Sequence, residues 1–175
     1  AAPCEAKCRR SALDAAVSIR ALKRFVCEKF GVESDAFNLG RVHPELKSDA
    51  SSMGHGHKVA VVGGGPAGMS CAHELALLGF GVTVFEAQSV AGGMLVLGVP
   101  EYRLPRELVK AEIRAIESLG VNIWLDQKLG RDFSLADLAA QGFEAVFLGI
   151  GAHLSRDLAI EGVQLDGVLR AIDFL

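Results

Sequence analysis

The sequence has no long apolar run and no strong excess of one charge, and these absences exclude several classes of protein. No stretch approaches the ~20 apolar residues that cross a bilayer, and no charged-then-apolar signal peptide opens the chain. The formal net charge of −3 arises from mixed signs, which gives no reason to expect nucleic acid or an anionic membrane as a partner. Its four cysteines are irregularly spaced, which argues against a disulfide framework. We therefore expect a cytoplasmic protein.

The sequence also lacks the residue patterns of side-chain catalysis. It contains no recognisable Ser-His-Asp or Cys-His arrangement and no H-E-x-x-H motif. This absence fits chemistry that resides in a bound cofactor, with the protein supplying position and electrostatics. With 175 residues, the chain suits one ordinary domain plus an appendage. Because an initiator Met is missing and the ending is abrupt, we expect a piece of a longer protein.

The hydrophobic pattern divides the chain into three parts. Residues 1–32 are expected to be helical, with apolar residues at intervals of three and four, and residues 33–57 read as a linker without periodicity. From residue 58 onward, apolar runs typical of buried strands alternate with helical patterns, which predicts an α/β, Rossmann-like domain with a parallel sheet. The expected strands are 59–62, 82–85, 121–125 and 145–150, and the expected helices are 67–78, 106–119 and 135–141.

Between the first predicted strand and helix lies Gly63-Gly64-Gly65-Pro66-Ala67-Gly68, which fits G-x-G-x-x-G. Three such glycines alone are a weak signal, but a strand before them and a helix after them are the context that dinucleotide binding requires. Gly63 permits the tight turn, Gly65 admits a pyrophosphate close to the backbone, and Gly68 lets the helix pack against the strand. The helix N-terminus then offers unpaired N–H groups to the phosphates.

Glu86 stands at the end of the second predicted strand, where the same pattern requires an acidic residue. Its carboxylate can accept hydrogen bonds from both hydroxyls of an adenosine ribose. A carboxylate there disfavours a 2′-phosphate, so NADP is not expected in this site. FAD and NAD both remain possible occupants.

A second glycine-rich segment begins at Gly92-Gly93-Met94-Leu95 and stays irregular through Pro100 to Pro105. A simple NAD-binding domain would normally enter its next helix here. Glycine-rich backbone can lie close against a flat ring, which favours a flavin over a nicotinamide. An ordinary long surface loop is the alternative.

Residues 58–175 resemble the FAD-binding half of the glutamate synthase small-subunit family, which includes the flavin module of dihydropyrimidine dehydrogenase and NADH-dependent ferredoxin:NADP oxidoreductase. The resemblance rests on the segments 61–68, 92–95, 98–105 and 147–152, and it extends to the N-terminal helix at residues 17–25. It implies an FAD site formed by Gly63, Gly65, Pro66, Ala67, Gly68, Glu86, Ala87, Gly92, Gly93, Met94, Leu95, Arg103, Leu104, Gly149 and Gly151.

Cys4 and Cys8 form a C-x-x-x-C pair, and two thiols alone cannot satisfy a cluster that needs about four ligands. Read without relatives, they are two unpaired surface cysteines. The family resemblance instead makes them surviving ligands of an N-terminal module that binds 4Fe-4S clusters, so that residues 1–32 would be its C-terminal part. We expect no stable cluster in this chain alone.

The same resemblance implies an NAD(P)H-dependent oxidoreductase that passes electrons between nicotinamide, FAD and iron–sulfur clusters, with a partner subunit or acceptor protein. The NADPH domain would lie beyond residue 175, which leaves the FAD site incomplete and the chain inactive alone. Two alternatives stay open: an NAD-dependent dehydrogenase domain, and a non-catalytic Rossmann-like interaction module.

Overall fold

The computed structural model describes residues 2–32 and 54–174. The chain divides into two compact units, residues 1–42 and residues 43–175. Most of the predicted linker, residues 33–53, lies outside the described residues, so the domain boundaries expected from the sequence stay a prediction.

The described part of the first unit is helical, and the apolar periodicity of the sequence falls on the longest of its helical elements. These elements are α1 (Pro3–Ala6), the 3-10 helix η1 (Arg9–Ala12) and α2 (Ile19–Phe30). The carboxylate of Glu5 accepts the backbone N–H of Arg20 at 2.9 Å, which ties α1 to the first turn of α2.

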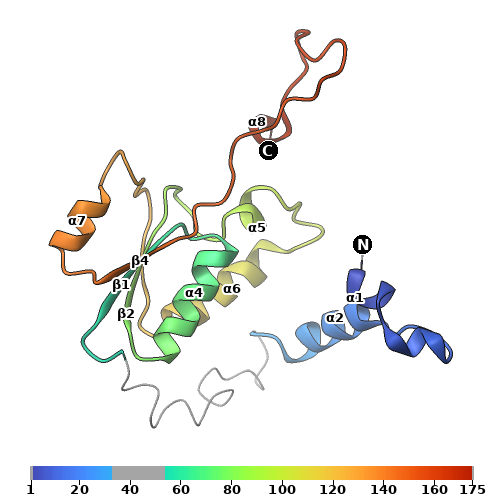
Figure 1. Ribbon diagram of the computed structural model, residues 1–175, viewed down its shortest axis with the longest axis horizontal. Coiled ribbons are helices and arrows are strands. Elements are labelled where there is room, and N and C mark those ends of the chain that lie inside the picture. The colour runs from blue at the N-terminus through green and yellow to red at the C-terminus, as the bar shows by residue number, and fades with distance from the viewer. Residues whose placement is uncertain (1, 33–53, 175) are drawn as a thin grey trace. The chain divides into compact units, whose positions relative to one another are not determined.

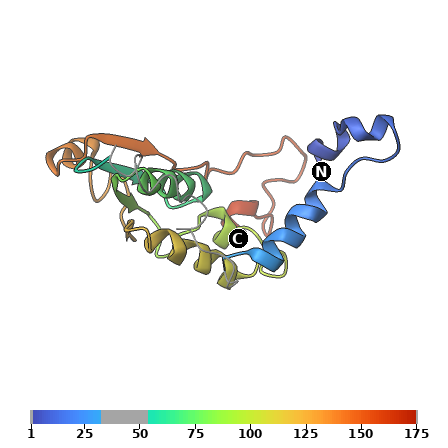
Figure 2. The same ribbon diagram turned by 90° about the horizontal axis from the view of Figure 1, so that it is seen from below.

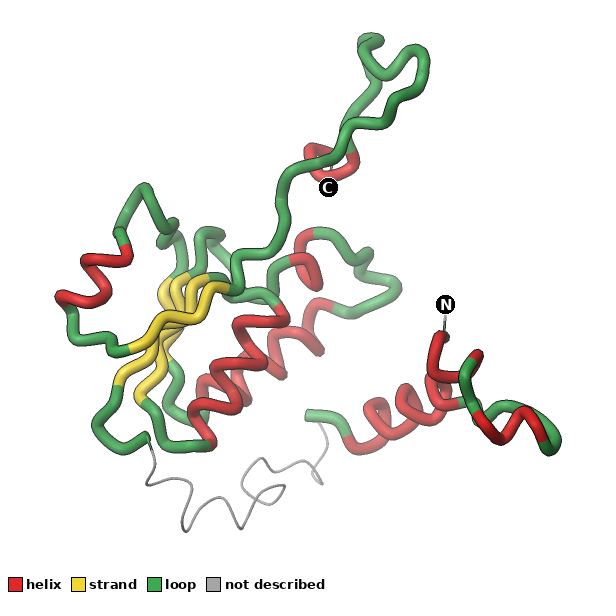
Figure 3. The backbone as a smooth tube through the Cα atoms, viewed as in Figure 1, coloured by secondary structure: helices red, strands yellow, loops and turns green. Residues whose placement is uncertain are grey.

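The second unit is built on a parallel four-stranded sheet, shown in yellow in Figure 3. Its strands run in the order β3-β2-β1-β4 and all neighbours are parallel. Their bounds are β1 (Lys58–Val62), β2 (Gly81–Phe85), β3 (Asn122–Trp124) and β4 (Ala145–Leu148). The helices are α4 (Pro66–Leu77), α5 (Met94–Leu97), α6 (Arg106–Glu117), α7 (Leu135–Ala140) and α8 (Ala171–Phe174). This topology confirms the α/β, Rossmann-like fold expected from the sequence.

Helices cover both faces of the sheet: α4 and α6 lie on one face and α7 lies on the other (Figures 1 and 2). Because successive side chains of a strand point to opposite faces, β1 contributes to two cores. Its Val61 packs toward α4 in a cluster with Val82 and Val84. Its Ala60 and Val62 belong to a second cluster on the α7 side. Both clusters rest on strands that are apolar on both sides, as parallel sheets require.

Two expectations about local structure are wrong. The sequence predicts a buried strand at 145–150, but β4 ends at Leu148, and Val146, Phe147 and Leu148 are 37–53% exposed. Within the described residues, β4 is an edge strand whose one neighbour is β1, which leaves its side chains partly uncovered. The segment after Gly93 is not wholly irregular, since Met94–Leu97 forms the single helical turn α5. The sequence shows correctly that both segments are apolar. It does not show whether a strand is paired on one side or on both sides within the sheet.

Helix α7 begins with a capping box that carries a stability prediction. The Ser134 hydroxyl accepts the N–H of Asp137, and the Asp137 carboxylate accepts the N–H of Ser134 at 2.7 Å. Ser134→Ala should lower the free energy of unfolding by about 1 kcal/mol, measured by urea denaturation.

The hydrogen bonds from Ser134 hold the pKa of Asp137 below its usual range. The contribution of Asp137 is therefore present above about pH 4 and is lost as the pH falls through the lower folded-state pKa. If Ser134→Ala had the same urea midpoint as the wild-type chain, this stabilising role of the capping box would be contradicted.

Among the residues that the structure describes, no helix combines the length and the apolar content needed to span a membrane.

Candidate functional site: a dinucleotide cavity

A cavity lies at the topological switch point of the sheet, where the direction in which strands are added reverses. The chain runs outward from β1 to β2 and β3, and then returns to add β4 on the other side of β1. Ligands of open α/β sheets bind at the carboxyl ends of the strands at such a switch point. A cavity of about 1200 Å³ lies there, and its lining includes Val62 and Gly63 after β1 and Leu148 and Gly149 after β4. We refer to it as the dinucleotide cavity. Its volume exceeds the roughly 300–1,000 Å³ of ordinary small-molecule sites, so it has room for a dinucleotide.

The first glycine loop forms one wall of this cavity. Gly63 has φ +106°, and a Cβ there would lie 2.4 Å from the carbonyl oxygen of Gly149. A Cβ on Gly68 would lie 1.8 Å from the carbonyl oxygen of Gly63. A Cβ on Gly65, by contrast, would have one heavy atom within 4 Å, the Cα of Gly93 at 3.9 Å. Gly63 and Gly68 therefore allow the chain to fold tightly, whereas Gly65 leaves open the space in front of the α4 N-terminus.

The N-terminus of α4 offers free donors to that space. Gly65 and Ala67 both line the cavity. Their backbone N–H groups make no hydrogen bond within the described part of the chain. Pro66, at the first helical position, has no N–H to satisfy. Two unpaired donors and the positive end of the helix dipole make this wall suited to phosphate oxygens.

Glu86 lies against the same loop and is only 7% exposed. Its Oε2 accepts the N–H of Gly64 at 2.6 Å, and its Oε1 accepts the N–H of Gln88 at 2.8 Å. These bonds fix the carboxylate between the glycine loop and the end of β2. Because a carboxylate offers about four acceptor positions, each oxygen keeps one for a ligand hydroxyl.

The second glycine loop packs directly on the first. The N–H of Gly92 donates to the carbonyl oxygen of Gly64 at 2.8 Å. Gly93 has φ +54°, and a Cβ there would lie 2.8 Å from the Cα of Gly65. The two loops therefore meet backbone to backbone, and α5 continues along the cavity from this contact. The sequence shows both loops but not that they touch.

The structure brings ten of the fifteen predicted FAD-contacting residues to the cavity wall and places five elsewhere. The ten in the wall are Gly63, Gly65, Pro66, Ala67, Glu86, Ala87, Gly93, Met94, Gly149 and Gly151. Gly68 and Gly92 are buried behind the loops that they shape. Leu95, Arg103 and Leu104 do not line the cavity. Their contact with a flavin stays a prediction.

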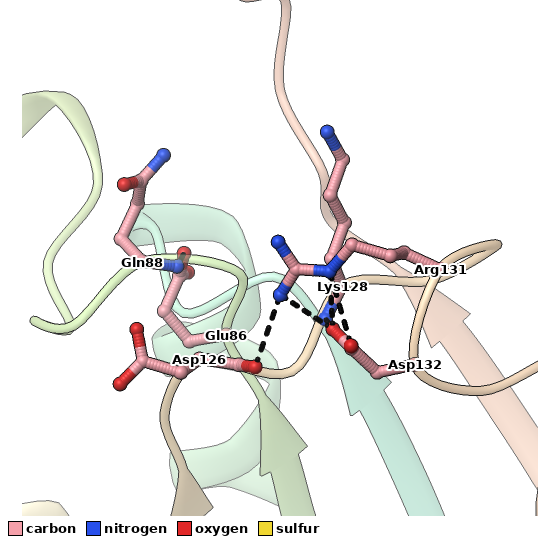
Figure 4. A network of polar contacts seen from close by, with 6 residues as sticks. All are labelled: Glu86, Gln88, Asp126, Lys128, Arg131 and Asp132. Carbon is pink, nitrogen blue, oxygen red and sulfur yellow. Dashed lines mark hydrogen bonds and ion pairs between the residues drawn. The ribbon is translucent and has the colours of Figure 1, made fainter.

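The sequence patterns do not reveal a group of cavity residues that follows β3, of which Lys128 and Arg131 are drawn in Figure 4. Gln127, Lys128, Leu129 and Arg131 all line the cavity. Arg131 pairs with the carboxylate of Asp132 at 2.7 Å, and that carboxylate also accepts the N–H of Lys128 at 2.8 Å. These residues could have been predicted from their position directly after a parallel strand, because the carboxyl ends of β1, β2 and β3 lie at the same edge of the sheet.

The predicted iron–sulfur ligands lie in the first unit. Cys4 is exposed and Cys8 is half-buried. The backbone N–H of Val17 points at the Cys8 sulfur at 3.5 Å, and this contact lowers the pKa of the Cys8 thiol below its usual value. In the described ranges, no three His, Cys, Asp or Glu side chains gather as metal ligands. The two cysteines alone do not fit a cluster with about four ligands.

The comparisons with known proteins agree with the Rossmann-like fold. The model of the NAD(P)-binding Rossmann-like domain matches residues 61–120. The β subunit of the NADP(+)-dependent formate dehydrogenase of Moorella thermoacetica is 42% identical over 99% of this chain and 26% of that protein. The NADPH glutamate synthase small chain of Bacillus subtilis is 37% identical over 99% of this chain and 33% of its own length. The structure of Mycobacterium tuberculosis FprA in complex with NADPH is similar to this chain, with a TM-score of 0.58 and 25% sequence identity. The match covers 67% of this chain and 28% of the FprA chain.

The fold, the cavity and the matching domain model together define a Rossmann-like domain of the NAD(P)-binding type. Over 99% of its length, the chain is similar to subunits of NADPH- and NADP-dependent oxidoreductases, the glutamate synthase small chain among them. It spans 26% and 33% of the length of the two relatives described above.

Proposed function

We propose that this chain is the FAD-binding part of an NAD(P)H-dependent oxidoreductase. The observation that carries the proposal is the arrangement of Gly65, Glu86 and Gly93 around one cavity. An open phosphate wall, a fixed ribose acceptor and a second backbone loop meet there. The first two contacts would serve any adenine dinucleotide. The second, glycine-rich loop favours a flavin over a nicotinamide, because its backbone can lie close against a flat ring.

The residues of the chain would position the cofactor rather than react with it. The N–H groups of Gly65 and Ala67 would bind the pyrophosphate, and the carboxylate of Glu86 would accept the ribose hydroxyls. When bound, FAD supplies hydride and single-electron transfer. The apolar side chains of Met94 and Leu97 on α5 would keep water from the cavity wall beside it.

The rest of the electron path would lie with other segments or subunits. The relatives named above are a β subunit and a small chain, which supports a partner subunit for this chain as well. Their names also contain NADP or NADPH, which supports a nicotinamide donor. Cys4 and Cys8 would supply two of the about four ligands that an iron–sulfur cluster needs, so the remaining ligands would have to come from another segment.

The test is a titration of the purified chain with FAD and, separately, with NAD, followed by flavin fluorescence and by calorimetry. We expect saturable, one-to-one binding of FAD and much weaker binding of NAD. Preference for NAD would favour the dehydrogenase alternative, and binding of neither ligand would favour the interaction module.

A further inference from the structure

The segment that follows β3 lies next to the ribose acceptor. The N–H of Gln127 donates to the backbone carbonyl of Glu86 at 2.8 Å, and the N–H of Asp126 donates to the carbonyl of Gln88 at 3.0 Å. Residues 126–132 are therefore joined to the end of β2 by two backbone hydrogen bonds. We refer to these residues as the β3 loop.

The strand order decides which part of a dinucleotide this loop meets. In the order β3-β2-β1, the glycine loop follows β1, Glu86 follows β2 and the β3 loop follows β3. With the phosphates over the first and the ribose at the second, the base attached to the ribose extends toward the third. The β3 loop therefore faces the adenine ring, and this step rests on the proposed function.

Arg131 is the residue of this loop best suited to a flat ring. Its Nε and Nη2 atoms donate to the Asp132 carboxylate at 2.7–3.0 Å, and its Nη2 lies 3.4 Å from the carbonyl oxygen of Asp126 (Figure 4). These acceptors occupy the edge of the guanidinium plane. Its faces stay open, and the Arg131 side chain is 61% exposed.

The same ion pair argues for stacking rather than phosphate binding. The Asp132 carboxylate already neutralises the Arg131 charge, and the hydrogen bond from Arg131 lowers the pKa of Asp132, so the pair is ionised at neutral pH. A guanidinium with its edge bonded to a carboxylate still stacks through its face on a π-system. We propose that Arg131 is the adenine-recognition residue of the dinucleotide cavity, with its guanidinium face against the ring.

The test compares FAD with FMN, which lacks the adenosine monophosphate half of FAD. Arg131→Ala should weaken FAD binding about tenfold and leave FMN binding unchanged, because a base stacked on a side chain is lost only from FAD. Arg131→Lys should behave like Arg131→Ala, since an ammonium group keeps the charge but not the plane. Arg114→Ala, on α6 and outside the dinucleotide cavity, is the matched control and should change neither affinity.

Three outcomes would overturn the assignment. Unchanged FAD affinity in Arg131→Ala would remove Arg131 from the site, and an equal loss for FMN would place it at a phosphate or at the flavin. Undiminished FAD affinity in Arg131→Lys would show that the positive charge at this position is sufficient and that the planar guanidinium is not needed. If the wild-type chain failed to bind FAD, the proposed function and this inference would fall together. Wild-type binding combined with any of the three outcomes would overturn the inference alone.

Discussion

Replacing Gly65 with alanine should leave the chain folded and lower its FAD affinity about a hundredfold or more. Gly65 has φ −76° and ψ −177°, a backbone conformation that alanine adopts without strain. The added methyl group would meet no protein atom closer than 3.9 Å, so it would project into the space reserved for the pyrophosphate. Losing two charge-assisted hydrogen bonds to phosphate, each worth about 1.5–3 kcal/mol, corresponds to this change in affinity.

Two other glycine variants make the result specific. Gly68→Ala places its Cβ 1.8 Å from the Gly63 carbonyl oxygen and 3.1 Å from a Val61 methyl, so it should cost about 3 kcal/mol or more of stability. Gly81→Ala, with its nearest neighbour at an ordinary 3.5 Å, should change neither stability nor binding. Urea midpoints and FAD titrations of all three variants separate folding from binding. Undiminished FAD affinity in Gly65→Ala would mean that no phosphate approaches this backbone.

The fold was predictable because its signals are local. Apolar runs such as Val59–Val62 and the turn at Gly63 specify a buried strand followed by a helix, whatever the rest of the chain does. The pairing of strands is not local. Val146, Phe147 and Leu148 have the apolar composition of a central strand, yet β4 lies at the edge of the sheet with these side chains partly exposed. Composition reports that a segment is apolar, not how many neighbours it has.

The candidate site divides in the same way. Gly65 and Glu86 were predictable because a known spacing follows from the geometry of one strand–helix–strand unit. Arg131 belongs to no such pattern. It reaches the cavity only because β3 pairs with β2, which brings the β3 loop to Glu86. Residues whose position depends on strand order cannot be found from spacing along the chain.

Removing the carboxylate of Glu86 should lower both the stability of the chain and its affinity for FAD. Glu86→Ala leaves the N–H groups of Gly64 and Gln88 without their acceptors, at a cost of about 1–3 kcal/mol for each donor that is left buried. The variant should therefore have a lower urea midpoint and bind FAD at least about tenfold more weakly. Glu112→Ala, an exposed glutamate on α6, is the control and should change neither quantity.

A comparison of two nucleotides separates the ribose contact from this loss of stability. AMP and 2′,5′-ADP differ only in a 2′-phosphate, which the Glu86 carboxylate should repel. The wild-type chain should therefore bind AMP in clear preference to 2′,5′-ADP, and Glu86→Gln, which keeps the size but not the charge, should narrow that preference while weakening the binding of AMP itself. A destabilised but folded variant with an unaltered preference would mean that Glu86 only supports the glycine loop. A narrowed preference would mean that the buried carboxylate, held by Gly64 and Gln88, also reads the sugar.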